Sequence, residues 1–471
     1  MRSRIALLLF LISSPLHALS NDAWLEDFRQ ILAEMSSHYA NLDSAIEDRH
    51  LDLVAIRKSA ESRIAAAKND AEAKEAIDWF MRQFCDGHVW VNWNVTSTNA
   101  GTTEEDRRPL CERLGYSRRE PGGIDFSQLP GYTPVRDEDS QFFPGGILRL
   151  SARKRLGVIR IHMFSETVHP ELCTQALASL EIAPDAECDF RCGYRVSITA
   201  ANLLTAALER RVEALHRAGA TALVIDITGN GGGSDWVEPA ARVLTSVPLR
   251  SPRLAFVRHP HWSGQLRERL ADIEADLSAA PTPELEDAKN KIVAAITEAE
   301  RPCDRSSLWG EPSKRPDCSL VVSGLLHSTG LRAHAKPGTI PETSASKGTI
   351  FHASHYAYRE GVNRLPLFVL TDGLTASASE LFVAMLRDND AARVAGTSTL
   401  GAGCGHTNGG IRSTLKNSGA KLELPDCIRL RADGTNEVLG IVPDVLVPWR
   451  SRDSAFQRAA KAAKALDLIV K

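Results

Sequence analysis

The chain has 471 residues, too many for one ordinary domain, and 43% of them are hydrophobic, so it can bury a sizeable core. Its 56 Lys and Arg residues nearly balance its 59 Asp and Glu residues, which gives a formal net charge of −3. Nothing in that balance indicates a nucleic-acid or anionic-membrane partner, so neither is predicted.

The first twenty residues have the three-part layout of a secretory signal peptide. Arg2 and Arg4 precede an apolar run over 5–12, and Ala18 and Ser20 provide a small-x-small end. The apolar run is too short to span a bilayer, and no later segment has eighteen consecutive apolar residues. We therefore expect 1–20 to be a signal peptide and the mature protein to be periplasmic or secreted, without membrane insertion.

The cysteines of an exported chain are candidates for disulfides. The sequence favours the pairs Cys303–Cys318 and Cys404–Cys427, which close local loops, and Cys188 is free to pair with Cys173 or Cys192. The odd total leaves at least one thiol unpaired, and Cys85 reads as a disulfide partner or a core thiol. A metal site is not predicted, because no second half-site at ligand spacing accompanies Cys188 and Cys192. The nine cysteines are at 85, 111, 173, 188, 192, 303, 318, 404 and 427.

Residues 21–83 have the apolar spacing of helices and are expected to form an N-terminal helical subdomain. Residues 84–146 begin with a segment around His88 that alternates like a strand after a glycine turn. The rest of that range is polar and rich in Gly, Pro, Arg and Glu, which predicts an irregular insertion.

From residue 147 the pattern changes to alternating strands and helices. Apolar runs over 157–161 and 222–227 flank a long helical pattern over 198–218. A second buried strand is expected over 366–371, followed by a helix over 381–387. Strands and helices joined by short connectors predict an α/β domain with a buried sheet.

This α/β domain is expected to comprise 147–261 and 301–471. Between the two parts, residues 262–300 are charged and rich in alanine, with Pro281 and Pro283 separating two helical stretches. The pattern predicts a helical hairpin inserted into the α/β domain.

Ser377 lies where the strand over 366–371 passes through a glycine turn into the following helix. Such a position exposes a hydroxyl and places backbone N–H groups and the positive helix end beside it. A nucleophilic serine needs that arrangement, because pre-aimed donors must hold the oxyanion. The alternative is structural, since Ser is also a common N-cap residue.

A second loop, over 229–233, contains four glycines after a buried strand and before a helix. Its N–H groups are suited to an anion, either as half of an oxyanion hole or as a phosphate site. The spacing does not match the phosphate-binding motif, and no lysine follows. The remaining alternative is a tight turn without a ligand.

Together these loops resemble those of the C-terminal processing and tricorn-type serine peptidases. The segment 222–233 is similar to the glycine loop of that family, and 375–380 resembles its nucleophile loop, in which the middle serine is the nucleophile. Gly440-Ile441-Val442-Pro443-Asp444 is similar to the family's G-x-x-P-D near the C-terminus. The resemblance implies a crotonase-like (ClpP-like) spiral of ββα units.

One departure from the family pattern changes the expected mechanism. The processing peptidases use a Ser–Lys dyad with the lysine 25 residues after the nucleophile, a position that is Ala402 here. The tricorn-like branch resembles a Ser–His system instead. His88 matches its histidine, and Glu437 matches the glutamate that precedes its G-x-x-P-D.

The resemblance therefore implies an exported serine endopeptidase that hydrolyses peptide or protein substrates through an acyl-enzyme. Ser377 is the expected nucleophile, His88 the base and Glu437 an assisting carboxylate. The N–H group of Ala378 and one from Gly231 or Gly232 are the expected oxyanion donors.

No cofactor or metal is expected, and the sequence indicates no oligomeric state. The alternatives are a non-catalytic ligand- or peptide-binding protein on the same fold and an esterase-type acyl hydrolase.

Overall fold

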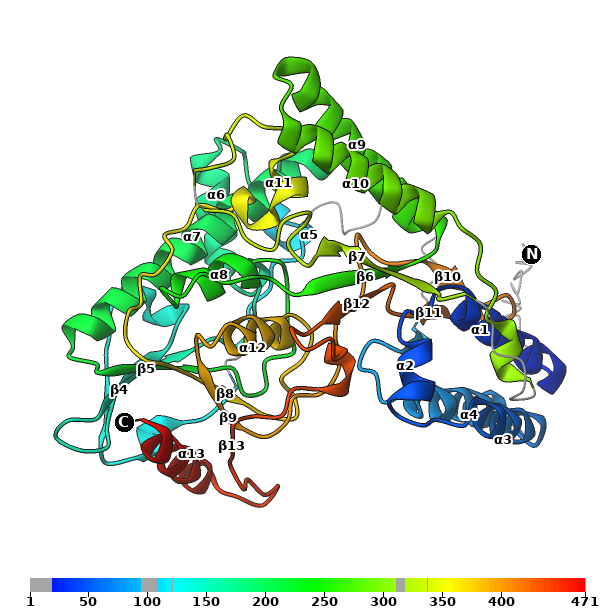
Figure 1. The fold of residues 1–471 in the computed structure, drawn as a ribbon. Helices are drawn as coiled ribbons and strands as arrows, with labels where there is room; N and C mark the ends of the chain where they lie inside the picture. Colours follow the sequence, from blue (N-terminus) through cyan, green and yellow to red (C-terminus); the bar gives the residue numbers. More distant parts are fainter. Residues whose placement is uncertain (1–18, 95–107, 120–121, 311–317, 337, 471) are drawn as a thin grey trace, which may run out of the picture.

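The computed structural model describes residues 19–94, 108–119, 122–310, 318–336 and 338–470. It has the predicted α/β class, with a seven-stranded mixed sheet at its centre (Figure 1). In spatial order the strands are β13 (Val445–Leu446), β9 (Arg393–Gly396), β8 (Leu367–Thr371), β5 (Ala222–Asp226), β4 (Arg155–Arg160), β3 (Gly145–Arg149) and β2 (Tyr132–Pro134). The five from β13 to β4 run parallel, and β3 and β2 are antiparallel to their neighbours.

The central strands are buried on both faces, which explains their continuous apolar sequences. Side chains alternate between the faces, so in β5 Leu223 and Ile225 join one apolar cluster while Ala222 and Val224 join another. The first cluster is covered by α6 (Pro170–Ser179), α7 (Phe190–Arg217), α8 (Val237–Val243) and α12 (Ala378–Asp388). The second is covered by the C-terminal helix α13 (Ala455–Ile469).

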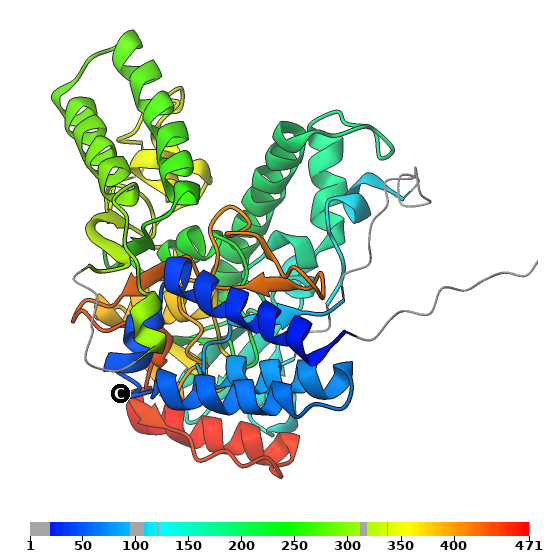
Figure 2. The same ribbon diagram turned by 90° about the vertical axis from the view of Figure 1, so that its right-hand side faces the viewer.

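The N-terminal helices, drawn in blue in Figure 2, form an apolar cluster of their own beside this domain. They are α1 (Asn21–His38), α2 (Leu42–Glu47), α3 (Leu53–Ala65) and α4 (Asp70–Arg82). A small antiparallel sheet packs against them and contains β1 (Trp90–Asn92), β11 (Lys421–Glu423) and β10 (Ser413–Thr414). Residues from the two ends of the chain therefore share one core.

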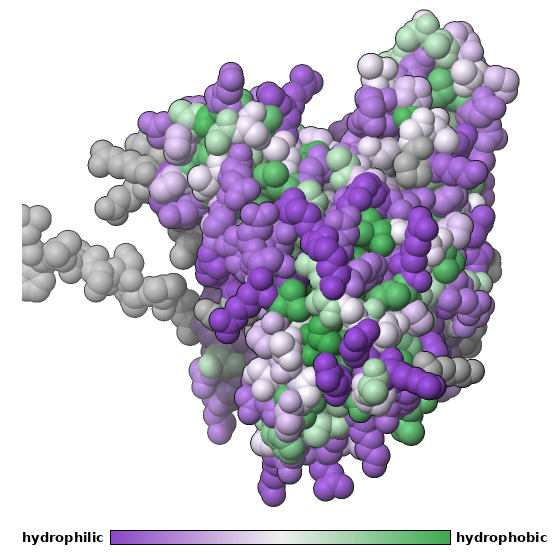
Figure 3. Space-filling view, turned by 90° about the vertical axis from the view of Figure 1, so that its left-hand side faces the viewer, coloured by the Kyte–Doolittle hydropathy of each residue, from purple (hydrophilic) through white to green (hydrophobic). Residues whose placement is uncertain are grey.

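A third sheet carries the helical hairpin. It consists of β12 (Cys427–Leu430), β6 (Arg253–Val257) and β7 (Val321–His327), all antiparallel, and packs against α9 (Pro260–Ala279) and α10 (Pro283–Ala299). The hairpin and the α6–α7 pair rise as two separate projections in Figure 2, and Figure 3 shows the surface hollowed between them. Two further α-helices are short, α5 (Leu110–Arg113) and α11 (Lys347–Ile350).

Four disulfides are formed. Cys303–Cys318 and Cys404–Cys427 confirm the two favoured pairs, Cys188 pairs with Cys192, and Cys111 pairs with Cys173. The interpretation of Cys85 was wrong, because its thiol is unpaired and exposed. Several disulfides are typical of proteins that fold outside the cytoplasm. Most of the expected signal peptide, residues 1–18, lies outside the described residues, and no described helix is long and apolar enough to cross a membrane.

Candidate active site

Ser377 lies at the carboxyl end of the central sheet, between strand β8 and helix α12. It is the N-cap residue of α12 and has a φ of 56° and a ψ of −119°. Left-handed backbone is costly for a residue with a side chain, and such strain gathers at functional sites. A sharp strand-to-helix turn of this kind exposes a serine hydroxyl above the sheet. The half-buried Ser377 therefore combines an unusual backbone conformation with a position at the start of a helix.

The glycine loop lies directly against this serine. A Cβ atom added to Gly232 would come within 2.8 Å of the Ser377 Cβ, so a larger residue has no room there. Asn230 holds the loop in place: its carbonyl accepts the Ala376 N–H at 3.0 Å, and its side chain donates to the Ile161 carbonyl at 3.0 Å. The two loops singled out from the sequence are thus brought together at one edge of the sheet.

The expected oxyanion donors differ in their availability. The Gly232 N–H donates to Asn230 Oδ1 at 2.9 Å and is engaged within the loop. Among the hydrogen bonds of the described residues, none uses the N–H of Gly231 or of Ala378. These two N–H groups therefore have no acceptor among the hydrogen bonds of the described residues.

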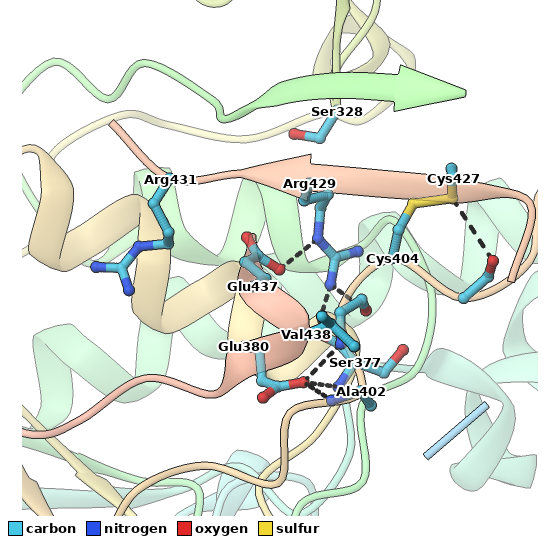
Figure 4. Close-up of polar contacts among 12 residues, drawn as sticks. Ser328, Ser377, Glu380, Ala402, Cys404, Cys427, Arg429, Arg431, Glu437 and Val438 are labelled. Atoms are coloured by element: carbon cyan, nitrogen blue, oxygen red, sulfur yellow. Dashed lines mark hydrogen bonds and ion pairs between the residues drawn. A yellow bond between two sulfur atoms is a disulfide. The ribbon is translucent and has the colours of Figure 1, made fainter. Parts of the chain in front are cut away.

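Glu380 joins the nucleophile loop to the loop over 399–403. It is fully buried and occupies the third position of α12, where its Oε2 accepts the Ser377 N–H at 2.9 Å. The same oxygen accepts the Ala402 N–H at 2.9 Å and the Gly403 N–H at 3.0 Å (Figure 4). Its Oε1 accepts the Gly401 N–H and the Thr399 hydroxyl, both at 2.7 Å. One carboxylate thus fixes two segments of the site.

Glu437 does not reach the serine side chain and acts on Arg429 instead. Its Oε2 lies 2.6 Å from Arg429 Nε, and both residues are buried. The Arg429 Nη2 donates to the Ser377 carbonyl at 2.8 Å and to the Gly403 carbonyl at 2.6 Å (Figure 4). Burial raises the pKa of Glu437, and the neighbouring guanidinium of Arg429 opposes that rise. The carboxylate therefore orients an arginine that holds the backbone of the site.

His88 lies in a turn just before β1, rather than within a strand as the alternating sequence predicted. Its backbone N–H donates to Asp86 Oδ1 at 3.0 Å, and Tyr39 and Asn41 donate to the other oxygen of that buried carboxylate. Burial raises the pKa of Asp86, and the hydrogen bond from His88 N–H opposes that rise. The turn is therefore anchored to the N-terminal helices.

The imidazole of His88 packs on the loop that Glu380 supports. Its Nδ1 lies 2.9 Å from the Ala402 carbonyl oxygen. A Cβ atom added to Gly405 would lie 2.9 Å from His88 Nε2, so the ring rests on the Gly405 backbone. No hydrogen bond joins this ring to the Ser377 hydroxyl among the described residues. Glu380 nevertheless links the two, because it binds the N–H groups of both Ser377 and Ala402.

Sequence reasoning missed Glu380, Arg429 and Asn230 as positioning residues. Glu380 had a detectable signal, since Ser377-Ala378-Ser379-Glu380 fits the S-x-x-E capping pattern. Arg429 had none, because the two carbonyls that it binds, those of Ser377 and Gly403, are brought to it only by the fold. Within the described ranges, no group of three or more His, Cys, Asp or Glu side chains is arranged to hold a metal ion.

Residues 319–447 match peptidase family S41, a range that contains the nucleophile loop and the G-x-x-P-D segment. The predicted resemblance to the S41 peptidases is confirmed. The match supports a peptidase. It does not reach His88 or the glycine loop, whose placement comes from the fold.

Solved structures share this fold over nearly the whole chain. Mature CPAF aligns with a TM-score of 0.59 at 14% identity, covering 95% of this chain and 96% of that one. Mature CPAF complexed with lactacystin aligns with a TM-score of 0.57 at 15% identity, covering 95% and 97%. At such identities the likeness concerns the fold alone. No curated protein sequence matches the chain.

Proposed function

We propose that this protein is an exported serine endopeptidase in which Ser377 attacks the peptide carbonyl and forms an acyl-enzyme. The observation that carries the proposal is the left-handed backbone of Ser377 at the start of α12, with Gly232 packed against it. This arrangement presents the hydroxyl at a helix N-terminus next to a glycine loop. The peptidase family match over 319–447 supports the same reaction class.

The oxyanion of the tetrahedral intermediate is held by the N–H groups of Ala378 and Gly231. Both belong to backbone that is fixed by other contacts, through α12 for Ala378 and through Asn230 for the glycine loop. Pre-positioned donors stabilise the developing charge without reorganising during the reaction. Gly232 contributes its small size, because its N–H already binds Asn230.

His88 is the general base, and the Ala402 carbonyl fixes its tautomer. A carbonyl oxygen only accepts hydrogen bonds, so the proton of a neutral imidazole lies on Nδ1 and leaves Nε2 free to accept. The backbone carbonyl thereby performs the orienting task that a carboxylate performs in a Ser-His-Asp triad. Nε2 takes the Ser377 proton during acylation and returns it to the leaving amine. Catalytic contacts are often long before substrate binds.

Glu437 assists indirectly through Arg429, which holds the carbonyls of Ser377 and Gly403. Gly403 follows the residue that orients His88, so this pair supports both sides of the site. Glu437 is therefore assigned as a positioning residue, which is the form that its expected assisting role takes in this proposal. Export rests on the residues 1–20 pattern together with the four disulfides.

Labelling with a fluorophosphonate probe tests the nucleophile. We expect the wild type and Ser379→Ala to be labelled and Ser377→Ala to remain unlabelled. Ser379 is the matched control, because it lies two residues away and is fully buried. A folded wild type that never labels would contradict the serine hydrolase and favour a binding protein. A panel of matched peptides and esters then separates an endopeptidase from an esterase, which cleaves only the esters.

A further inference from the structure

A cavity of about 390 Å³ adjoins the Ser377 site, between helix α9 and the segment over 345–355. Its inner end is lined by Leu381 and Arg429. Leu381 lies one helical turn after Ser377, and Arg429 donates to the Ser377 carbonyl. An extended peptide advances about 3.3 Å per residue, so a substrate held at Ser377 can reach this cavity with residues a few positions away.

The inserted helical hairpin forms one wall of this cavity. Trp262, Gln265, Arg269 and Asp272 of α9 recur at helical spacing and therefore share one face. The opposite wall contains His352 and His355. The hairpin projects beside the hollow in Figure 3, with hydrophilic and hydrophobic residues mixed on its surface. Its inner face is thus part of the surface next to the nucleophile.

Arg269 is the unusual residue of this wall. Its guanidinium lies 5.9 Å from the centroid of the Trp262 ring, and no hydrogen bond or ion pair engages it within the described part of the chain. Burial lowers its pKa, while Asp235 opposes the shift. A guanidinium carries five donors in a fork that fits a carboxylate, and it stays charged in proteins. A partly buried one without an acceptor therefore favours an anionic ligand.

Three carboxylates also line the cavity, and their positions decide between an anionic and a cationic ligand. Asp235 forms an ion pair with His352 at 3.2 Å. Glu268 and Asp272 are exposed, so water and salt screen their charges. Arg269 is less exposed than either, and its field inside the cavity is screened less.

We propose that Arg269 binds a carboxylate of the peptide substrate, so that the hairpin makes the enzyme selective for acidic peptides. The inference rests on the proposed peptidase function for the identity of the ligand. The carboxylate comes either from an Asp or Glu side chain or from the peptide C-terminus. Both sources present the same planar group to the guanidinium.

Binding to the inactive Ser377→Ala protein tests this proposal without requiring catalysis. The probes are fluorescein-labelled, C-terminally amidated decapeptides in which each position in turn is Glu, Gln or Lys, and fluorescence polarisation gives the Kd. At one or more positions we expect Glu to bind at least about tenfold more tightly than Gln. The preference disappears in Arg269→Gln. It persists in Arg267→Gln, because Arg267 lies on the exposed face of α9 and pairs with Glu300.

Equal binding of the Glu and Gln peptides at every position overturns the proposal. A preference for the Lys peptides also overturns it, because the exposed carboxylates Glu268 and Asp272 would then determine which peptides the cavity binds. A parallel set with free C-termini identifies the source: tighter binding of the free acid than of the amide, lost in Arg269→Gln, supports the same site with the terminus as ligand.

Fluorophosphonate labelling of wild type and Arg269→Gln separates this inference from the proposed function. Labelling of both proteins without any carboxylate preference means that only the cavity assignment fails. A carboxylate preference without labelling means that only the catalytic assignment fails.

Discussion

The two halves of the candidate site are built in different ways. Ser377 is fixed by the strand and helix on either side of it, β8 and α12, whose side chains are almost all buried, most of them in the two apolar clusters that flank the central sheet. His88 lies in a surface turn between two apolar clusters, and its contact with Ala402 joins residues 314 positions apart. The proposed nucleophile is thus built on local structure, whereas the proposed base depends on a long-range contact.

Replacing His88, the proposed base, should have the largest effect on activity. We expect His88→Ala to lower kcat/KM by on the order of 10³-fold, because the serine then has no group to accept its proton. The free energy of unfolding should change little, since the ring is only half-buried. Kinetics with added imidazole provide the check, because a missing base is partly restored by it. A variant with unchanged kcat/KM would remove His88 from the mechanism.

Replacing Glu380, whose carboxylate joins the two halves of the site, should lower both activity and stability. Glu380→Gln replaces one acceptor oxygen with an NH₂ group that faces backbone N–H donors, so we expect a loss of about 2–4 kcal/mol of stability. The kcat should fall while KM changes less. Urea denaturation and steady-state kinetics measure both quantities.

Glu72→Gln is the matched control, because Glu72 occupies the same helix position in α4 but is exposed. If the two variants lose equal stability, the Glu380 carboxylate does not join the halves of the site.

The Cys404–Cys427 disulfide lies in the half of the candidate site that contains His88. Cys404 stands between Gly403, which binds Arg429, and Gly405, on which the His88 ring rests. Cys404→Ala with Cys427→Ala should cost about 3 kcal/mol. It should also slow Ser377 labelling more than the paired alanine variant of Cys303 and Cys318. Equal labelling rates for the two pairs would show that this disulfide serves stability alone.

A buried histidine at the edge of the N-terminal helices gives a pH-dependent effect. Burial lowers the pKa of His38 to about 3, with smaller contributions from His259 and His261. In the unfolded chain this histidine takes up its proton near pH 6.5. The free energy of unfolding therefore falls as the pH drops from about 6.5 toward 3, and the whole contribution of neutral His38 to stability is present above that range.

Because of His38, the free energy of unfolding should be lower at pH 5 than at pH 7 by about 2 kcal/mol. His38→Gln should reduce the difference between urea denaturations at the two pH values. A variant with the same acid sensitivity as the wild type would mean that another group causes the loss of stability. His169 is an example, because burial also lowers its pKa to about 3.

Long, strongly patterned elements were the predictable part of the fold. The strand expected over 222–227 is β5, and the strand expected over 366–371 is β8, each within one residue at its ends. Their continuous apolar sequences reflect burial on both faces. Strand β7, by contrast, was not predicted, because Ser323 and Gly324 interrupt its apolar pattern in the middle and its partner β6 is more than sixty residues away.

The sequence by itself determined that Ser377 follows a buried strand, opens a helix and is accompanied by a glycine loop, because these features follow from residue spacing within short segments. Tertiary structure decided what surrounds the serine. Ala402, at the position that aligns with the lysine of the processing peptidases, is buried, and its side chain lies beside Gly87. Its backbone carbonyl instead meets His88, and Glu380 ties that contact to the nucleophile. The contact between His88 and Ala402 joins residues 314 positions apart, and only the packed chain brings them together.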